Sequence, residues 1–229
     1  MRHSRLLLPL CAGLLAACSP SAPPPSEAAA AAPAAAPAEV APPQPLTEIW
    51  ELPDGPVTRA DMEARFGATN LRREMRPGPE GDVGQYPVLV LFPDDAKKRL
   101  ELVVDAEHPD AAFPVVSASG PESLWHDASG LRPGMSLEEL VALNGAPVSF
   151  HGLGWDYGGT VADWHGGKLA SAEGATRVRS VILAAREGAD SNKLPMGDGS
   201  FRSDDARWAN AGKDMVVREV GIRWSNAAR

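Results

Sequence analysis

The sequence is almost free of cysteine. Its 229 residues include two cysteines, Cys11 and Cys18, and both stand near the N-terminus. A fold built from the residues after Cys18 therefore has no disulfide, no thiol nucleophile and no thiolate metal site. Its stability has to come from an ordinary hydrophobic core.

Familiar catalytic motifs are also missing. The sequence contains no G-x-S-x-G, H-x-H or H-E-x-x-H, and the run GLGWDYG from Gly152 has the wrong spacing for a phosphate-binding loop. The formal net charge of −8 argues against a nucleic-acid partner and against direct docking on anionic lipid. We expect no enzymatic activity, no cofactor and no bound metal.

The N-terminus has the pattern of a secretory signal peptide. Arg2 and Arg5 precede an apolar run from Leu6 to Ala17, which is too short to span a membrane. The four residues Leu15-Ala16-Ala17-Cys18 resemble the lipobox of bacterial lipoproteins. This resemblance implies that residues 1–17 are removed and that Cys18 carries the lipid, including palmitate. An ordinary signal cleaved elsewhere, or an uncleaved anchor, is the alternative.

The residues after Cys18 indicate where the protein is held. Ser19, rather than an aspartate, follows the lipobox, and the resemblance then points to the periplasmic side of the outer membrane. Residues 19–46 contain eleven alanines and nine prolines. Such a composition cannot bury enough apolar surface to offset its ordering entropy, so we expect residues 18–46 to form a disordered tether.

Two segments of the remaining sequence match one another. VTRADMEARFGA begins at Val57, and MSLEELVALNGA begins 78 residues later at Met135. Each predicts a short capped helix. The N-cap, the acidic residue of the capping box and the C-terminal glycine are Thr58, Asp61 and Gly67 in the first segment and Ser136, Glu139 and Gly145 in the second.

Runs rich in β-branched and aromatic residues follow each helix. These predicted strands are Tyr86–Phe92, Arg99–Asp105, Ser149–Tyr157, Thr160–Trp164, Arg177–Ala185 and Met215–Trp224. We expect an α+β fold, a tandem repeat of a short helix followed by antiparallel strands. The first unit covers residues 47–125. The second covers 126–229 and has an insertion near 186–212, with a short helix at Ser203–Asn210.

The second helix carries a family resemblance. Gly134, Met135, Ser136, Gly145 and Pro147 match a signature of small outer-membrane lipoproteins of the SmpA/OmlA type, which include the BamE subunit of the barrel-assembly machinery. The tandem arrangement is similar to that of β-lactamase inhibitory proteins, although those contain cysteines. GLGWDYGG also resembles a phrase found in uncharacterised bacterial secreted proteins. These resemblances imply a role in contacting another protein, with no functional residue carried over.

The stretch GLGWDYGGTVADWHGG, from Gly152 to Gly167, has the densest aromatic and glycine content. The favoured interpretation is a packing hairpin, because Gly-Gly between β-like runs marks a turn and large rings pack across strands. In that hairpin the side chains of Phe150, Trp155, Tyr157 and Trp164 pack against neighbouring residues.

Three functional alternatives use the same stretch. A glycan or peptidoglycan groove would stack sugars on Trp155, Tyr157 and Trp164 and hydrogen-bond them through Asp156 and Asp163. The two aspartates could instead hydrolyse a glycoside, which requires a suitable separation of the carboxyl groups. A zinc site would draw its ligands from His151, Asp156, Asp163 and His165.

Two weaker candidates lie elsewhere. SLWHDASG places His126 and Asp127 near Ser123 and Ser129, but triads are spatial arrangements and a packed linker explains this segment as well. GDGSFRSDD, from Gly197, lacks the order of a calcium loop. The sequence as a whole predicts an envelope protein that binds another envelope protein. The alternative is a cell-wall glycan-binding protein or hydrolase.

Replacement of Cys18 tests the predicted anchor. Cys18→Ala removes the thiol that would form the lipid thioether, so the variant should incorporate no radiolabelled palmitate and should leave the membrane fraction. The wild-type protein, labelled in parallel, is the control. A wild-type protein without label would contradict the anchor.

Overall fold

The computed structural model describes residues 50–78, 84–155 and 157–225, all of which lie in one compact unit. The predicted signal peptide, Cys18, the tether and Asp156 lie outside the described residues. Within the described part, no helix combines the length and the hydropathy that crossing a membrane would require.

The two predicted helices are confirmed as α1 (Arg59–Phe66) and α2 (Leu137–Asn144). Each begins with a complete capping box. The Thr58 hydroxyl accepts a hydrogen bond from the backbone of Asp61, whose carboxylate accepts one from the backbone of Thr58, and Ser136 and Glu139 repeat both contacts. These bonds satisfy amide groups that the first helical turn leaves free, which lets helices of eight residues form on a packed sheet.

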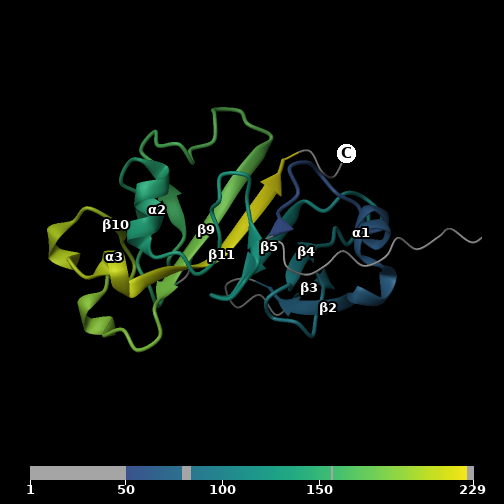
Figure 1. Cartoon of the computed structure of the whole chain (residues 1–229), viewed down its shortest axis with the longest axis horizontal. Helices are drawn as coiled ribbons and strands as arrows, with labels where there is room; N and C mark the ends of the chain where they lie inside the picture. The colour runs from purple at the N-terminus through teal and green to yellow at the C-terminus, as the bar shows by residue number, and fades with distance from the viewer. Residues whose placement is uncertain (1–49, 79–83, 156, 226–229) are drawn as a thin grey trace, which may run out of the picture. The chain divides into compact units, whose positions relative to one another are not determined.

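The main sheet is antiparallel and has six strands in the order β2-β3-β4-β5-β11-β9 (Figure 1). Its strands are β2 (Leu71–Pro77), β3 (Gln85–Leu91), β4 (Leu100–Val103), β5 (Val115–Ser119), β9 (Arg177–Ala185) and β11 (Met215–Trp224). The sequence predicted β9 and β11 with their observed bounds and β3 and β4 within a few residues. It missed β2, a charged edge strand, and β5, a short one.

The remaining elements are short. β10 (Ser200–Arg202), β7 (Ser149–His151) and β8 (Val161–Asp163) form a second antiparallel sheet, and β1 (Trp50–Glu51) pairs in parallel with β6 (Trp125–His126). Single turns occur at η1 (Ala68–Asn70), η3 (Ser191–Lys193), η4 (Ala206–Trp208) and α3 (Ala211–Asp214).

Two sequence predictions are wrong in this region. The strand predicted to run from Ser149 to Tyr157 ends at His151, where the chain leaves the ladder for a loop. The helix predicted at Ser203–Asn210 is only the single turn η4. The Asp205 side chain bonds the nearby Arg207 N–H, which favours a turn, and the Ser203 hydroxyl is held by the backbone of the distant Val148.

A single hydrophobic core lies against one face of the main sheet, here called the inner face. It contains Leu89 and Leu102 from the sheet, Met62 from α1 and Leu140 from α2, all almost inaccessible to solvent. Both helices therefore pack on the inner face. Trp125 is also buried in this core, and its indole N–H donates a 2.7 Å hydrogen bond to the carbonyl of Lys98.

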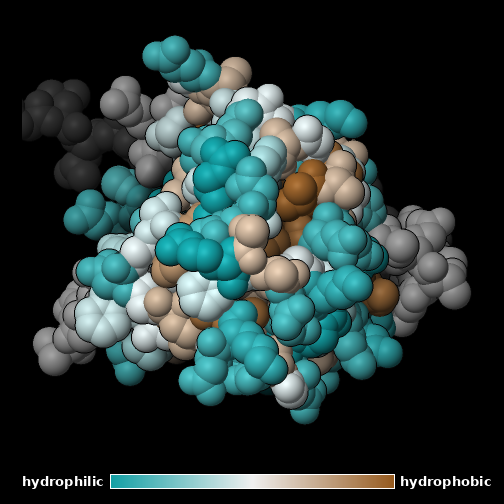
Figure 2. All heavy atoms as spheres, turned by 90° about the vertical axis from the view of Figure 1, so that its left-hand side faces the viewer, coloured by the Kyte–Doolittle hydropathy of each residue, from teal (hydrophilic) through white to brown (hydrophobic). Residues whose placement is uncertain are grey.

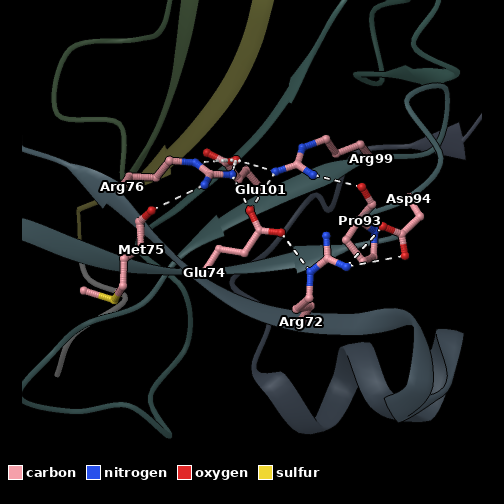
Figure 3. A network of polar contacts seen from close by, with 8 residues as sticks. All are labelled: Arg72, Glu74, Met75, Arg76, Pro93, Asp94, Arg99 and Glu101. Carbon is pink, nitrogen blue, oxygen red and sulfur yellow. Dashed lines mark hydrogen bonds and ion pairs between the residues drawn. The ribbon is translucent and has the colours of Figure 1, made fainter.

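The opposite, outer face carries a layer of ion pairs over β2, β3 and β4 (Figure 3). Glu74 lies at its centre and accepts from Arg72, Arg76 and Arg99 at 2.9 to 3.2 Å, while Glu101 bonds two of the same arginines. The cross-strand partners of Glu74 and Arg72 are Val88 and Val90, both fully buried. The long side chains thus share a sheet face with the two valines and shield it from water, while their charged ends pair with one another.

Burial raises the pKa of Glu74, but hydrogen bonds from Arg76, Arg72 and Arg99 outweigh burial and lower it to about 2. A carboxyl group with a lowered folded-state pKa stabilises the fold above its unfolded pKa. That contribution is lost as the pH falls from the ordinary value of about 4.5 towards 2.

Acid unfolding tests this network. The urea midpoint of the wild type should fall as the pH is lowered from about 5 to 3, and Glu74→Gln should show a shallower fall because the titrating group is gone. The matched control is Glu63→Gln in the exposed Arg59–Glu63 pair of α1, which should keep the wild-type slope. Equal slopes for all three proteins would show that Glu74 does not contribute.

Candidate functional site

The aromatic loop, defined as residues 152–160, leaves β7 and returns to β8. Its base is closed by hydrogen bonds from the backbone of His151 to Thr160 and from Gly159 to His151. A further bond, 2.8 Å long, joins the Leu183 N–H of β9 to the Gly159 carbonyl. The loop is therefore anchored to the edge of the main sheet.

A second anchor lies on the other side of the loop. The Leu153 N–H donates to the carbonyl of Pro195 at 2.8 Å, and the Gly197 N–H donates to Leu153 at 2.9 Å. These bonds bring the insertion of residues 186–212 against the loop. Residues that are about forty positions apart in the sequence thus form one surface.

Close backbone contacts explain the glycines of the stretch. A Cβ on Gly159 would lie 1.9 Å from the carbonyl oxygen of Leu183, and the residue has a φ of +81°. A Cβ on Gly152 would lie 2.3 Å from the carbonyl oxygen of Gly197. No other residue type fits at these positions without a shift of the backbone.

The aromatic residues divide into two groups. Phe150 is fully buried and Trp164 is half-buried against the core, as a packing hairpin requires. Trp155 and Tyr157 are 61% and 66% exposed, so the predicted packing role is wrong for both. The physical reason is that alternation between core and solvent stops where β7 ends, and the loop turns its rings outward.

A cavity of about 370 Å³ lies beside Trp155. Its walls come from the aromatic loop, the end of β9, the insertion and β11. The cavity is lined by Leu153, Gly154, Trp155, Gly158, Leu183, Ala184, Ala185, Ser191, Met196 and Arg218. Most of these residues are apolar or small, Met196 is 43% exposed, and the polar side chains are those of Ser191 and Arg218.

Figure 2 shows the side that carries β10 and α3, where hydrophilic residues surround a hydrophobic area near the centre. The larger exposed hydrophobic residues of the described chain are few, and Trp155, Tyr157 and Met196 are three of them. Solvent exposure of such residues in one place marks a surface that contacts a ligand or partner.

The structure brings Asp163 and His165 together, but neither residue lines the cavity beside Trp155. The Asp163 carboxylate lies 3.5 Å from His165 Nδ1, and His165 Nε2 lies 2.8 Å from the hydroxyl of Ser149. These three residues resemble a triad in type only, because 3.5 Å is too long for a good hydrogen bond and none of them lines the cavity. Among the described residues, no cluster of three or more histidine, aspartate or glutamate side chains could hold a metal ion.

The other serine–histidine candidate is a structural ion pair. Asp127 is fully buried and accepts from Arg179 Nε at 2.5 Å, from the Ser129 hydroxyl and from the Ser129 N–H at 2.8 Å. Burial raises the pKa of Asp127, but the bonds from Ser129 and Arg179 outweigh it and lower the pKa. His126 Nδ1 bonds the Asp127 carbonyl rather than a serine hydroxyl.

The acidic segment after Gly197 is likewise used within the fold. Asp204 forms an ion pair with Arg202, and Asp205 caps η4 and pairs with Arg207. These contacts satisfy the carboxylates that a calcium loop would direct at an ion.

The sequence could identify the stretch but not the site. Ser191, Met196 and Arg218 escaped notice because each stands alone in an unremarkable segment, and only the fold brings them to Trp155. Comparison with known proteins adds nothing here: no family model, curated protein or solved structure matches the chain.

Substitutions should separate the structural glycines from the exposed ring. Gly159→Ala introduces a clash and a left-handed alanine, and we expect it to lower the free energy of unfolding by about 3 kcal/mol. Gly166→Ala is the matched control, because Gly166 has a φ of +71° and open space around its Cβ position. It should cost only about 1 kcal/mol.

Trp155→Ala should change the free energy of unfolding by less than about 0.5 kcal/mol, since the ring is mostly exposed. Phe150→Ala, in the adjacent strand, should cost about 3–5 kcal/mol. Denaturant titration measures all four variants. If Trp155→Ala lowered the free energy of unfolding by several kcal/mol, the ring would have a packing role after all.

Proposed function

We propose that this chain is a non-enzymatic lipoprotein of the bacterial outer membrane, which faces the periplasm and binds another envelope protein. The observation that carries the proposal is the exposure of Trp155, which lines an apolar cavity, and of Tyr157 in the same loop. Tryptophan, tyrosine, methionine and arginine are the residues that protein interfaces favour, and each occurs at this surface.

The polarity of the cavity favours a protein over a glycan. A sugar presents hydroxyl groups that need several hydrogen-bonding side chains around a stacking ring. The described lining offers only Ser191 and Arg218, whereas Leu153, Leu183 and Met196 offer apolar contact. Asp163 and Trp164, which a glycan groove would have used, do not line this cavity. Hydrolysis has still less support, because no carboxylate stands among the described lining residues.

The order of the strands supports a repeat of two units. Four strands that follow α1 occupy one side of the main sheet, and β11 and β9, which follow α2, occupy the other. A bridge between Thr160 and Ile182 places the β8 end of the second sheet beside β9. We infer that two related helix-and-strand units meet at their last strands, β5 and β11.

Site-specific crosslinking tests the proposed function. A photoreactive benzoylphenylalanine placed at Tyr157 should form an adduct with one defined envelope protein in intact cells. The same probe at Arg207, whose side chain is 76% exposed on another segment, should not. Adding Trp155→Ala should reduce the Tyr157 adduct at least about tenfold, because a central interface tryptophan carries a large share of binding energy.

Binding to purified peptidoglycan is measured with the same variants. Co-sedimentation that Trp155→Ala abolishes, together with no protein adduct from position 157, would overturn the proposal in favour of the glycan-binding alternative. Equal adducts from positions 157 and 207 would show that contact at the aromatic loop is non-specific.

A further inference from the structure

A second cavity adjoins the one beside Trp155. It has a volume of about 480 Å³ and is lined by Pro121, Gly134, Ala184, Ala185, Arg186, Glu187, Val216, Val217 and Arg218. Ala184, Ala185 and Arg218 line both cavities. The two cavities are therefore parts of one groove, which crosses the ends of β9 and β11 from the aromatic loop to the segment around Pro121.

A β-bulge places Arg218 between the two cavities. The pairing of β11 with β9 shifts its register between Val217 and Glu219, so Arg218 has no partner residue in β9. Its backbone carbonyl accepts a hydrogen bond from Gly120 at 3.0 Å, which anchors the bulge to the end of β5. Bulges of this kind redirect a side chain out of the regular alternation of a strand.

The guanidinium of Arg218 is exposed and makes no hydrogen bond or ion pair with the described residues. The neighbouring carboxylate, Glu219, lies close enough to Arg218 for their charges to attract, and it hydrogen-bonds Ser117 on β5. Arg72, Arg76, Arg99 and Arg179, by contrast, are all paired with carboxylates. Arg218 thus offers a guanidinium without a hydrogen-bonded carboxylate, in a groove that also holds the charged residues Arg186 and Glu187, on a chain whose formal net charge is −8.

We infer that the groove binds an extended peptide segment of the partner protein, with an apolar side chain beside Trp155 and a carboxylate on Arg218. This inference rests on the proposed function and adds the chemistry of the partner. Two features of the groove carry it. An apolar cavity with Leu153, Leu183 and Met196 takes a hydrocarbon side chain, and a free guanidinium forms paired, charge-assisted hydrogen bonds with a carboxylate.

A panel of labelled peptides tests the inference. Fluorescein-labelled heptapeptides carry one leucine and one glutamate at every relative spacing on a glycine–serine background, and matched panels carry glutamine or lysine in place of glutamate. Binding to the purified full-length protein is followed by fluorescence anisotropy. We expect at least one glutamate peptide to bind about fivefold more tightly than its glutamine counterpart, with the lysine peptide weaker still.

Variants assign the difference to Arg218. Arg218→Gln should remove the preference for glutamate over glutamine, and Arg218→Lys should retain part of it. Arg223→Gln is the control, because Arg223 is an exposed arginine of the same strand that lines neither cavity. It should keep the full preference. Trp155→Ala should weaken every leucine peptide regardless of its charge.

Three results would overturn the inference. These are an absence of binding by any glutamate peptide, a charge preference that survives Arg218→Gln, and binding of soluble peptidoglycan fragments in place of peptides. The crosslink from position 157 distinguishes a failure of this inference from a failure of the proposed function. If that adduct still depends on Trp155, the protein-binding role stands and only the carboxylate contact falls.

Discussion

The antiparallel pairing of β5 with β11 is the contact on which the rest of the structure depends. Five residue pairs, from Glu219–Ser119 to Arg223–Val115, join the strands that follow α1 to those that follow α2. Without this seam, each half would present an unpaired strand edge and an incomplete core. With it, Val116 and Ile222 lie side by side on the inner face, and α1 and α2 cover one continuous hydrophobic surface.

The outer face over β2, β3 and β4 and the ends of β9 and β11 carry charge in different ways. Over β2, β3 and β4, arginine and glutamate side chains pair with one another on the face that holds two buried valines, and their charges are mutually satisfied. At the ends of β9 and β11, small residues leave a groove. There the guanidinium of Arg218 makes no hydrogen bond or ion pair with the described residues. A satisfied network stabilises a fold, whereas an unsatisfied charge beside apolar surface favours an external partner.

The aromatic loop combines a structural role with the proposed binding role within a few residues. Its glycines let two other backbone segments approach closely, at Leu183 of β9 and at Gly197 of the insertion. That rigid base keeps Trp155 and Tyr157 in solvent, where a ring on a flexible loop would lose more conformational entropy on binding. Tyr157 itself has a φ of +57°, which is rare for an aromatic residue and shows how strongly the surrounding bonds determine the loop.

Local patterns in the sequence determined α1 and α2 with their caps, as well as β9 and β11, because capping boxes and apolar β-branched runs act over a few residues. The absence of cysteine after Cys18 and the absence of familiar catalytic motifs could likewise be read from the sequence alone. Tertiary structure decided the features that depend on distant contacts. β2 and β5 are strands because they pair with neighbouring strands. Trp155 and Tyr157 are exposed because the strand before them ends. The groove at Arg218 has no sequence signal, since its walls come from segments that are far apart in the sequence and meet only in the folded chain.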